Sequence, residues 1–374
     1  MSELYIGLMS GTSLDGVDAV LVDFPKEQHP RLNLKVLVHV ALPFTQDLKQ
    51  TFFALNAPAD NEIHCAALAA NALTAVYAQA VQALLDDTQL KATQIQAIGA
   101  HGQTVRHQPG AHDGIGYTTQ LNNPSLLAER TGISVVADFR SRDVAAGGQG
   151  APLVPVFHQG VFAQQNETVG VLNIGGIANL SVLHANGEVI GFDCGPGNAL
   201  MDHWCRQHRG FAYDDDGQWA RTGQVDGPLL QAMLAEPFLQ QAPPKSTGRD
   251  LFHAQWLGSH LADFTNVSAV DVQTTLTEFT ARACASDVLR HANGAKELIL
   301  CGGGALNGFL MERLQTALPN CKVLSSTDRG MPPLQVEATA FAWLARQTVL
   351  GLVGNAPKVT GAIGTRILGG IYPA

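Results

Sequence analysis

The stretch LYIGLMSGTSLDGVDAVLVDF, residues 4–24, combines two apolar runs with a turn rich in glycine, hydroxyl and carboxylate groups. The runs Leu4–Met9 and Val17–Phe24 are rich in Val, Ile and Leu, which predicts two β-strands. A plain hairpin needs a turn of about two residues, whereas the turn SGTSLDG at 10–16 is longer. The turn therefore predicts a site that holds a ligand.

The pattern around this hairpin recurs in the second half of the chain. Periodicity predicts the order β-β-β-α-β-α-β-α twice. The first copy has strands at 4–9, 17–24 and 33–42, one ending at Ile98 and one at 133–136, with helices at 60–85, 124–130 and 152–162. The second has strands at 168–174, 177–184, 188–193, 297–301 and 322–324, with helices starting near 198 and 304 and at 271–291 and 334–349.

A three-strand meander followed by alternating helices, present twice, predicts an α/β protein of duplicated ribonuclease-H-like domains. The alternative is one irregular α/β sheet whose element order matches by chance. We expect a first domain at 1–140 plus about 351–374, because the glycine-rich tail should pack back on it. The second domain is expected at 141–350, with an insertion at about 209–268 that contains the motif APPKSTGRD.

Composition excludes several classes of protein. Of 374 residues, 46% are hydrophobic and 15% charged, which is typical of a well-cored globular chain. The net charge is −9 and no basic run is present, which argues against nucleic-acid binding. Six cysteines without a CxxC pair indicate reduced thiols of a cytoplasmic protein. We see no signal-peptide layout and no run of about 18 apolar residues, and so expect no membrane span.

Three glycine clusters follow predicted strands, at 10–16, 173–179 and 301–308. None fits a P-loop or a G-x-G-x-x-G fingerprint. Glycine permits positive φ and close approach of a phosphate, so two such turns facing each other across a cleft would bind a polyphosphate. The candidate nucleotide-binding residues are Gly11, Thr12, Ser13, Leu14, Asp15, Gly16, Val17, Asp18, Gly175, Gly176, Gly302, Gly303 and Gly304.

Each cluster also has a structural interpretation. Asp15 and Asp18 are candidates for holding Mg²⁺, directly or through water. Alternatively, Asp15-Gly16 is an ordinary turn dipeptide and Asp18 a partly buried hydrogen-bonding residue. The glycines at 302–304 are equally suited to a flexible helix entry.

Six segments together resemble the anhydro-N-acetylmuramic acid kinases, members of the actin, sugar kinase and Hsp70 superfamily. They are MSGTSLDGVD (9–18), HGQT (101–104), ADFRSRDVAAGGQGAPLVP (137–155), LNIGGIANL (172–180), FDCGPGNALMD (192–202) and CGGGALNG (301–308). The resemblance runs from Ile6 to about Gly370. It implies an actin-like ATPase fold with a central nucleotide cleft.

The resemblance also implies an activity. Water opens the 1,6-anhydro ring of anhydro-N-acetylmuramic acid, and the released 6-hydroxyl receives the γ-phosphoryl group of ATP with Mg²⁺. The products are N-acetylmuramic acid 6-phosphate and ADP, in cell-wall recycling. The family implies a homodimer, with a small-molecule substrate and neither nucleic acid nor membrane as partner.

Asp193 and Glu337 are the candidate catalytic residues. Asp193 ends a predicted strand in FDCGPGN, and the resemblance supports it as the general base that activates water. Alternatively, Asp193 caps the loop at 195–197. Glu337 matches a position that the family uses near its active site, although a Glu in a first helical turn also suits the helix dipole.

The candidate sugar-binding residues are His101, Gln103, Thr104, Arg140 and Arg142. The first three follow a strand end, where their side chains can hydrogen-bond hydroxyl groups. An arginine is a bidentate partner for the lactyl carboxylate of muramic acid. The alternative is that both arginines pair with the neighbouring carboxylates at 138 and 143.

Three other functions fit parts of the sequence less well. Another sugar kinase of the superfamily would phosphorylate an intact sugar without ring opening, and motif spacing does not exclude it. A sugar-responsive regulator would carry an N-terminal helix-turn-helix, for which the strand at Leu4 leaves no room. A chaperone or filament protein would need a peptide-binding domain or polymer contacts.

Overall fold

The structure is a computed structural model that describes residues 3–11, 13–26, 32–247 and 251–374. Contacts divide the chain into two units, Met1–Val161 with Leu334–Ala374, and Phe162–Pro333. The sequence-based division drew its boundaries elsewhere. It gave 141–161 and 334–350 to the second domain, whereas their contacts lie within the first unit.

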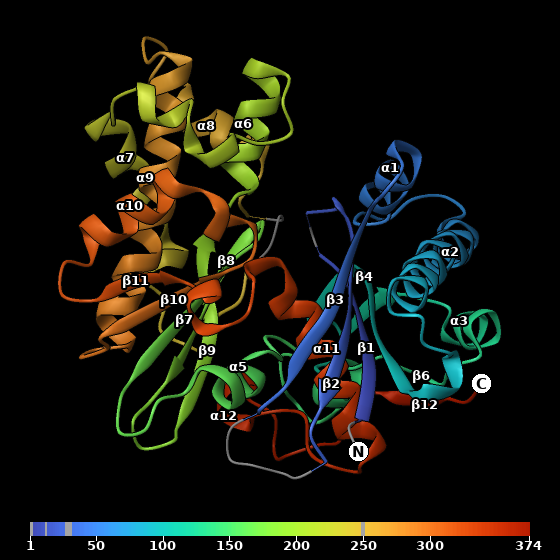
Figure 1. Ribbon diagram of the computed structural model, residues 1–374. Coiled ribbons are helices and arrows are strands. Elements are labelled where there is room, and N and C mark those ends of the chain that lie inside the picture. Colours follow the sequence, from blue (N-terminus) through green and yellow to red (C-terminus); the bar gives the residue numbers. More distant parts are fainter. Residues whose placement is uncertain (1–2, 12, 27–31, 248–250) are drawn as a thin grey trace. The chain divides into compact units, whose positions relative to one another are not determined.

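The first unit is built on a seven-stranded sheet (Figure 1). Its strands, in spatial order, are β3 (Lys35–Pro43), β2 (Gly16–Phe24), β1 (Glu3–Ser10), β4 (Ile95–Pro109), β6 (Val135–Ala137) and β12 (Gly370–Tyr372), and β5 (Gly116–Leu121) pairs with β4. The strands β1, β4 and β6 are parallel, and the others pair antiparallel. Because β12 pairs with β6, the prediction that the tail returns to the first sheet is confirmed.

Helices cover both faces of this sheet. One face packs against α1 (Gln46–Ala54), α2 (Glu62–Thr88) and α3 (Pro124–Thr131), whose apolar side chains form one core with those of β1 and β2. By length and mean hydropathy, 1.3 over 18 residues, α2 also meets the criterion for a membrane span, which the core helix of a globular protein can equally pass. The Ala-rich composition explains this, and the buried side of α2, including Leu73 and Tyr77, belongs to the core.

On the other face, α11 (Val336–Val349) lies directly on the backbone of β1 and β4. A Cβ added at Gly7 would lie 1.8 Å from the Ala338 carbonyl oxygen, and one at Gly99 would lie 2.0 Å from that of Phe341. Only glycine allows a helix to approach a sheet so closely. The Arg346 guanidinium bonds the Glu3 carboxylate, so α11 runs antiparallel to β1 and begins at the carboxyl end of that strand.

The second unit repeats the strand order of the first. Its five strands are β9 (Val189–Pro196), β8 (Ile177–Leu183), β7 (Val169–Ile174), β10 (Glu297–Cys301) and β11 (Lys322–Ser325). Antiparallel β7, β8 and β9 correspond to β1, β2 and β3, and β10 and β11 lie parallel to β7 as β4 and β6 lie parallel to β1. The duplicated ribonuclease-H-like fold of actin-like ATPases is therefore confirmed.

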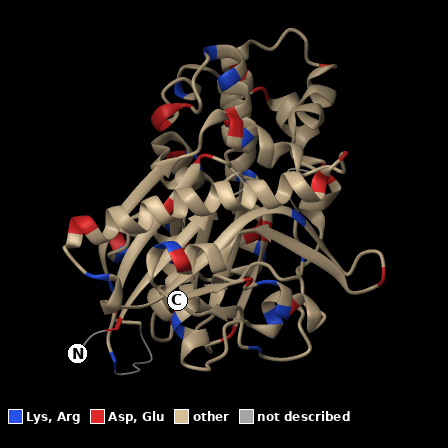
Figure 2. Ribbon diagram, turned by 90° about the vertical axis from the view of Figure 1, so that its right-hand side faces the viewer, with Lys and Arg blue, Asp and Glu red and all other residues tan. Residues whose placement is uncertain are grey.

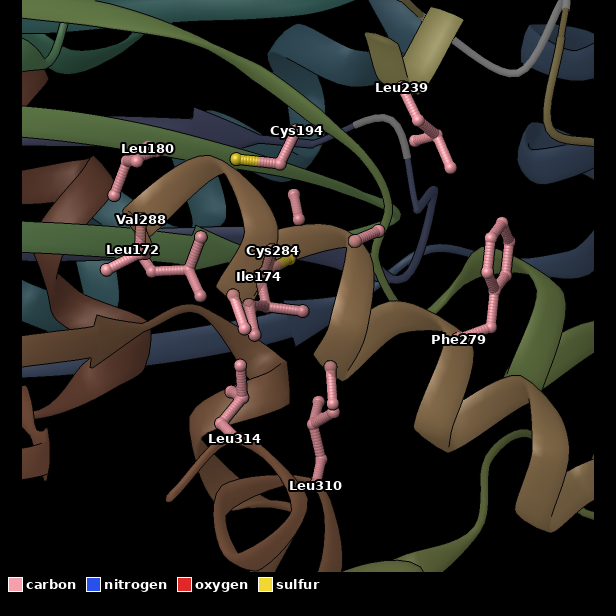
Figure 3. Packing of buried hydrophobic residues seen from close by; sticks show 14 of the residues in the cluster. Leu172, Ile174, Leu180, Cys194, Leu239, Phe279, Cys284, Val288, Leu310 and Leu314 are labelled. Atoms are coloured by element: carbon pink, nitrogen blue, oxygen red, sulfur yellow. The ribbon is translucent and has the colours of Figure 1, made fainter. Parts of the chain in front are cut away.

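Five helices supply the core of the second unit. They are α6 (Ala199–Arg209), α7 (Gly227–Leu234), α8 (Ala254–Leu261), α9 (Ala269–His291) and α10 (Gly308–Ala317), and each contributes buried side chains to a single cluster with β7 and β8. Figure 3 shows Val288 of α9 beside Leu172 of the sheet, with Phe279 of the same helix farther along, on the side of Leu239. The predicted insertion thus contributes α7 and α8 to this core.

Some local predictions were wrong. The helix α1 and the strand β5 were not predicted. The helix α9 begins two residues before the predicted start at 271, and the side chain of Ser268 caps it. Five of the six cysteines are buried and all six are free, as expected of reduced thiols.

Lys and Arg residues are interspersed with Asp and Glu along the chain (Figure 2).

The contact between α11 and the first sheet predicts the effect of a single methyl group. Gly99→Ala should lower the free energy of unfolding by at least about 2 kcal/mol, because its Cβ would meet backbone rather than a side chain that can move. Urea unfolding measures this change. Gly258→Ala on α8 is the control: no atom lies within 4 Å of its Cβ, and alanine should be neutral or stabilise by up to about 1 kcal/mol. Equal stability of Gly99→Ala and wild type would contradict the contact.

Candidate functional site

The turn between β1 and β2 carries the predicted phosphate-binding residues. Its positive φ falls on Leu14, at 61°, and not on a glycine as we expected. Gly16 is required by the fold, since a Cβ there would lie 2.2 Å from the Leu42 carbonyl oxygen. At Gly11 the nearest atom to an added Cβ is 3.7 Å away, so its space is open to a ligand. Thr12 lies outside the described residues.

The other residues of this turn divide into core and surface. The side chains of Leu14 and Val17 are buried in the core beneath the sheet, and Ser13 is half-buried. Asp15 is exposed. Asp18 bonds His39 Nε2 through Oδ1 at 2.8 Å, which fits the hydrogen-bonding alternative that the sequence left open.

Polar side chains meet beside the end of β1, where β4 continues past it. His101, Gln103 and Thr104 lie within β4 rather than after a strand end as predicted. Gln103 is fully buried and donates from Nε2 to the Gly11 carbonyl at 3.1 Å, which ties β4 to the turn. Arg140 donates from Nε and Nη2 to His101 Nε2 at 3.1 and 3.0 Å, and from Nη1 to the Gly150 carbonyl. Thr104 Oγ1 accepts from Gln120. Gln103 therefore lies against Gly11, and His101 and Arg140 are bonded to each other.

The His101–Arg140 contact fixes the tautomer of the imidazole. A guanidinium only donates, so Nε2 of His101 accepts and the ring proton lies on Nδ1. Burial, with the nearby Arg140 charge, lowers the pKa of His101 to about 3. The ring is therefore neutral at physiological pH, and its Nδ1–H is a buried donor. Hydrogen bonds with the backbone of Gly102 and Ser10 raise the pKa of His101, but by less than burial and Arg140 lower it.

The remaining predicted residues of this unit differ in exposure. Arg142, on α4 (Ser141–Ala145), is exposed. Asp143 is buried and accepts from Gly150, Asn355 and Thr360, so it anchors the C-terminal tail. Glu337 is half-buried in the first turn of α11, one turn before Phe341, whose ring lies 4.6 Å from that of His101.

In the second unit the two other glycine clusters lie together. The Asn198 N–H donates to the Gly175 carbonyl at 2.7 Å, and its side chain donates to Ile174. Gly303 lies against the same side chain, with 3.5 Å from an added Cβ to Nδ2. Sequence reasoning missed Asn198, although it stands within the quoted FDCGPGNALMD.

These glycines have different roles. A Cβ at Gly302, where φ is 75°, would lie 2.4 Å from Asn173 Oδ1, and one at Gly304 would lie 2.4 Å from Ile174, so both serve local packing. Gly176 is buried, and its carbonyl accepts from Gly197. At Gly175 the nearest atom to an added Cβ is 3.8 Å away. Gly175 therefore matches Gly11 as an open position on a hairpin turn.

Asp193 lies within β9, opposite Asn179 and three residues before the strand ends, rather than at its end as predicted. Its N–H donates to the Lys245 carbonyl at 3.1 Å, and its Oδ2 accepts from the Thr247 N–H at 3.0 Å. The carboxylate is half-buried. These bonds fix its orientation, as a general base requires.

A divalent metal would need ligands beyond those of the chain. Among the described residues, no group of three or more His, Cys, Asp and Glu side chains is placed to hold a metal ion. A phosphate-bound Mg²⁺ needs only one or two carboxylates, since the phosphates and waters supply the rest. The exposed Asp15 fits that requirement better than Asp18, whose Oδ1 is engaged.

The neutral His101 predicts a pH dependence of stability. Its unfolded pKa is near 6.5 and its folded pKa about 3, so between these values the unfolded state binds a proton that the folded state does not. Stability therefore falls as the pH drops below about 6.5. From pH 7 to pH 5 wild type should lose up to about 2 kcal/mol more than His101→Gln in urea unfolding. The exposed His64→Gln should follow wild type, and parallel curves for wild type and His101→Gln would contradict the assignment.

Comparison with known proteins gives a family for the whole chain. The family model described as anhydro-N-acetylmuramic acid kinase matches residues 3–374. Proteins of that name from Albidiferax ferrireducens and Variovorax paradoxus are each 58% identical, covering all of this chain and 100% and 99% of their own. One from Chromobacterium violaceum is 51% identical over the full length of both chains.

A solved structure is similar at a much lower level. The activator of the 2-hydroxyisocaproyl-CoA dehydratase from Clostridium difficile, with bound ADPNP, aligns with a TM-score of 0.47 and 11% identity, covering 95% of this chain and 100% of that one. So distant a likeness bears on neither function nor site. The full-length matches above decide the family. The chain belongs to the anhydro-N-acetylmuramic acid kinase family.

Proposed function

We propose that this protein is an ATP-dependent kinase that opens 1,6-anhydro-N-acetylmuramic acid with water and phosphorylates O6, in peptidoglycan recycling. The family match over residues 3–374 is the observation that carries the proposal. The fixed carboxylate of Asp193 supports it, because ring opening by water needs an oriented base.

In the proposed reaction Asp193 takes a proton from water as the water oxygen bonds to the anomeric carbon. The bond from that carbon to O6 breaks, and its electron pair leaves with O6. O6 then forms a bond to the γ-phosphorus of ATP, and the bond to the bridging oxygen breaks to release ADP. Asp193 finally releases its proton to solvent. The products are N-acetylmuramic acid 6-phosphate, ADP and one proton, so atoms and charge balance.

The glycine turns of both units are proposed to bind the triphosphate. Gly11 and Gly175 are supported by the open space at their Cα atoms, which lets a phosphate approach backbone N–H groups. Asp15, and less directly Asp18, would hold Mg²⁺, which when bound neutralises charge on the phosphates. Gly303, beside Asn198, is proposed to face the nucleotide.

The sugar is proposed to bind at the linked side chains of the first unit. Gln103 and Thr104 supply amide and hydroxyl groups, and the Nδ1–H of His101 supplies a donor. Arg140 orients His101, while Arg142 is exposed; both are candidates for the lactyl carboxylate. Glu337 is proposed as a second catalytic residue beside them.

The proposal extends to a cytoplasmic homodimer without a nucleic-acid or membrane partner. Free thiols at all six cysteines suit a reducing compartment. The family resemblance supports the dimer. Light scattering of the purified protein tests it directly, with a monomeric mass as the contrary result.

Removal of the proposed base should separate turnover from nucleotide binding. Asp193→Asn keeps an oxygen that accepts from Thr247 but does not take a proton, so kcat should fall by about 10²- to 10⁴-fold. The Kd for ATP, measured by calorimetry, should change by less than about twofold. Asp263→Asn, an exposed control in the same unit, should behave as wild type. Near-normal turnover of Asp193→Asn on the anhydro-sugar would remove Asp193 from this role.

A side chain at the open glycine of the second unit should block the phosphates. Gly175→Val should raise the Kd for ATP by at least about tenfold, or ~1.4 kcal/mol. The protein itself has room for the added Cβ, so thermal stability should change little. Gly258→Val, equally open but on α8, should leave ATP affinity unchanged. Unaltered affinity of Gly175→Val would place the nucleotide elsewhere.

A further inference from the structure

The segment 241–247, of sequence QAPPKST, forms both described hydrogen bonds to Asp193. The Lys245 carbonyl accepts from the Asp193 N–H at 3.1 Å, and the Thr247 N–H donates to Asp193 Oδ2 at 3.0 Å. One bond holds the main chain and the other the carboxylate. The direction of the carboxylate therefore depends on where this segment lies.

A buried ion pair determines where the segment lies. Lys245 Nζ is 3.0 Å from Asp287 Oδ2 of α9, and both side chains are 1% exposed. The ammonium also lies over the rings of Phe192 and Phe238, at 5.6 and 5.1 Å from their centroids. A charge removed from water must keep such partners, so Nζ has a single favourable position. The positions of the Lys245 carbonyl and the Thr247 N–H are thereby fixed.

Stability is a weak explanation for this pair. Desolvation of two charges offsets much of their attraction, and an apolar pair of similar volume often stabilises a protein as well or better. An ion pair joined by a hydrogen bond requires a particular orientation of its two side chains, whereas an apolar pair does not. The two kinds of pair therefore differ in how precisely they fix orientation rather than in how much they stabilise the protein. Its distinctive effect is therefore on the placement of the segment that Lys245 carries.

We infer that Lys245 and Asp287 are positioning residues, which hold the segment 241–247 so that its carbonyl and N–H groups aim the Asp193 carboxylate at the attacking water. This role deepens the proposed function and rests on it for the part played by Asp193. It also explains why the PPKST motif, at 243–247, contacts a strand that ends at Pro196.

The first test compares two isosteric changes on the same helix. Asp287→Asn weakens the ion pair with Lys245. Glu278→Gln weakens the ion pairs of another buried carboxylate of α9 with the partly exposed Arg282 and Arg313, which do not involve the segment. Asp287→Asn should lower kcat by about 10- to 100-fold with KM for sugar and ATP within about threefold, since misplacement of a catalytic group acts on turnover. Glu278→Gln should keep kcat within about twofold.

Hydrogen–deuterium exchange measures how firmly the segment 241–247 is held, and it does so without an assay of enzyme activity. Peptides that cover 241–247 should exchange faster in Asp287→Asn than in wild type, and at the wild-type rate in Glu278→Gln. A wild type that does not phosphorylate the anhydro-sugar would overturn the proposed function. Unchanged exchange at 241–247 would overturn the positioning role, whatever the activity.

A double variant covers the case in which Asp287→Asn fails to fold. Lys245→Met with Asp287→Leu removes both charges and should regain wild-type thermal stability. Its kcat should nevertheless remain about tenfold or more below wild type, because methionine packs without a fixed direction. A double variant, or a folded Asp287→Asn, with wild-type kcat would show that the pair is merely structural and would overturn the inference.

Discussion

The constraint on which the candidate sites depend is the position of the first strand of each meander. In both units this strand lies parallel to the strand that follows the meander. In the first unit β1 ends at Ser10, opposite Gln103 within β4, and this brings Gln103 to the Gly11 carbonyl at 3.1 Å. In the second, the ends of β7 and β10 bring Asn173 against Gly302. The same strand order therefore brings together, once in each unit, polar groups that are far apart in the sequence.

Glycine has two distinct uses in this chain, and the space at each Cα distinguishes them. At Gly7, Gly16 and Gly99 an added Cβ would meet backbone oxygen at 1.8–2.2 Å, so these positions serve the packing of strand on strand and helix on sheet. At Gly11 and Gly175 the protein leaves room. Glycine is not needed there for the fold, which is why ligand approach is the better explanation.

Sequence patterns predicted the repeat and the duplicated fold, because these follow from the periodicity and order of the apolar runs. They did not predict contacts between residues far apart in sequence. The bond between Asp18 and His39, on the next strand, is one such contact. The bonds from Lys245 and Thr247 to Asp193 span more than 50 residues, and no local pattern encodes them. Asn198 was overlooked since its role depends on the Gly175 carbonyl.

The central claim is that water, directed by Asp193, opens the sugar ring before or as O6 is phosphorylated. Incubation with ATP, Mg²⁺ and the anhydro-sugar in ¹⁸O-labelled water, followed by mass spectrometry of the product, tests it most directly. One ¹⁸O at the anomeric hydroxyl of a 6-phosphorylated sugar, with no label in the phosphate, is the predicted result. A phosphorylated product that still contains the anhydro ring and no ¹⁸O would contradict it.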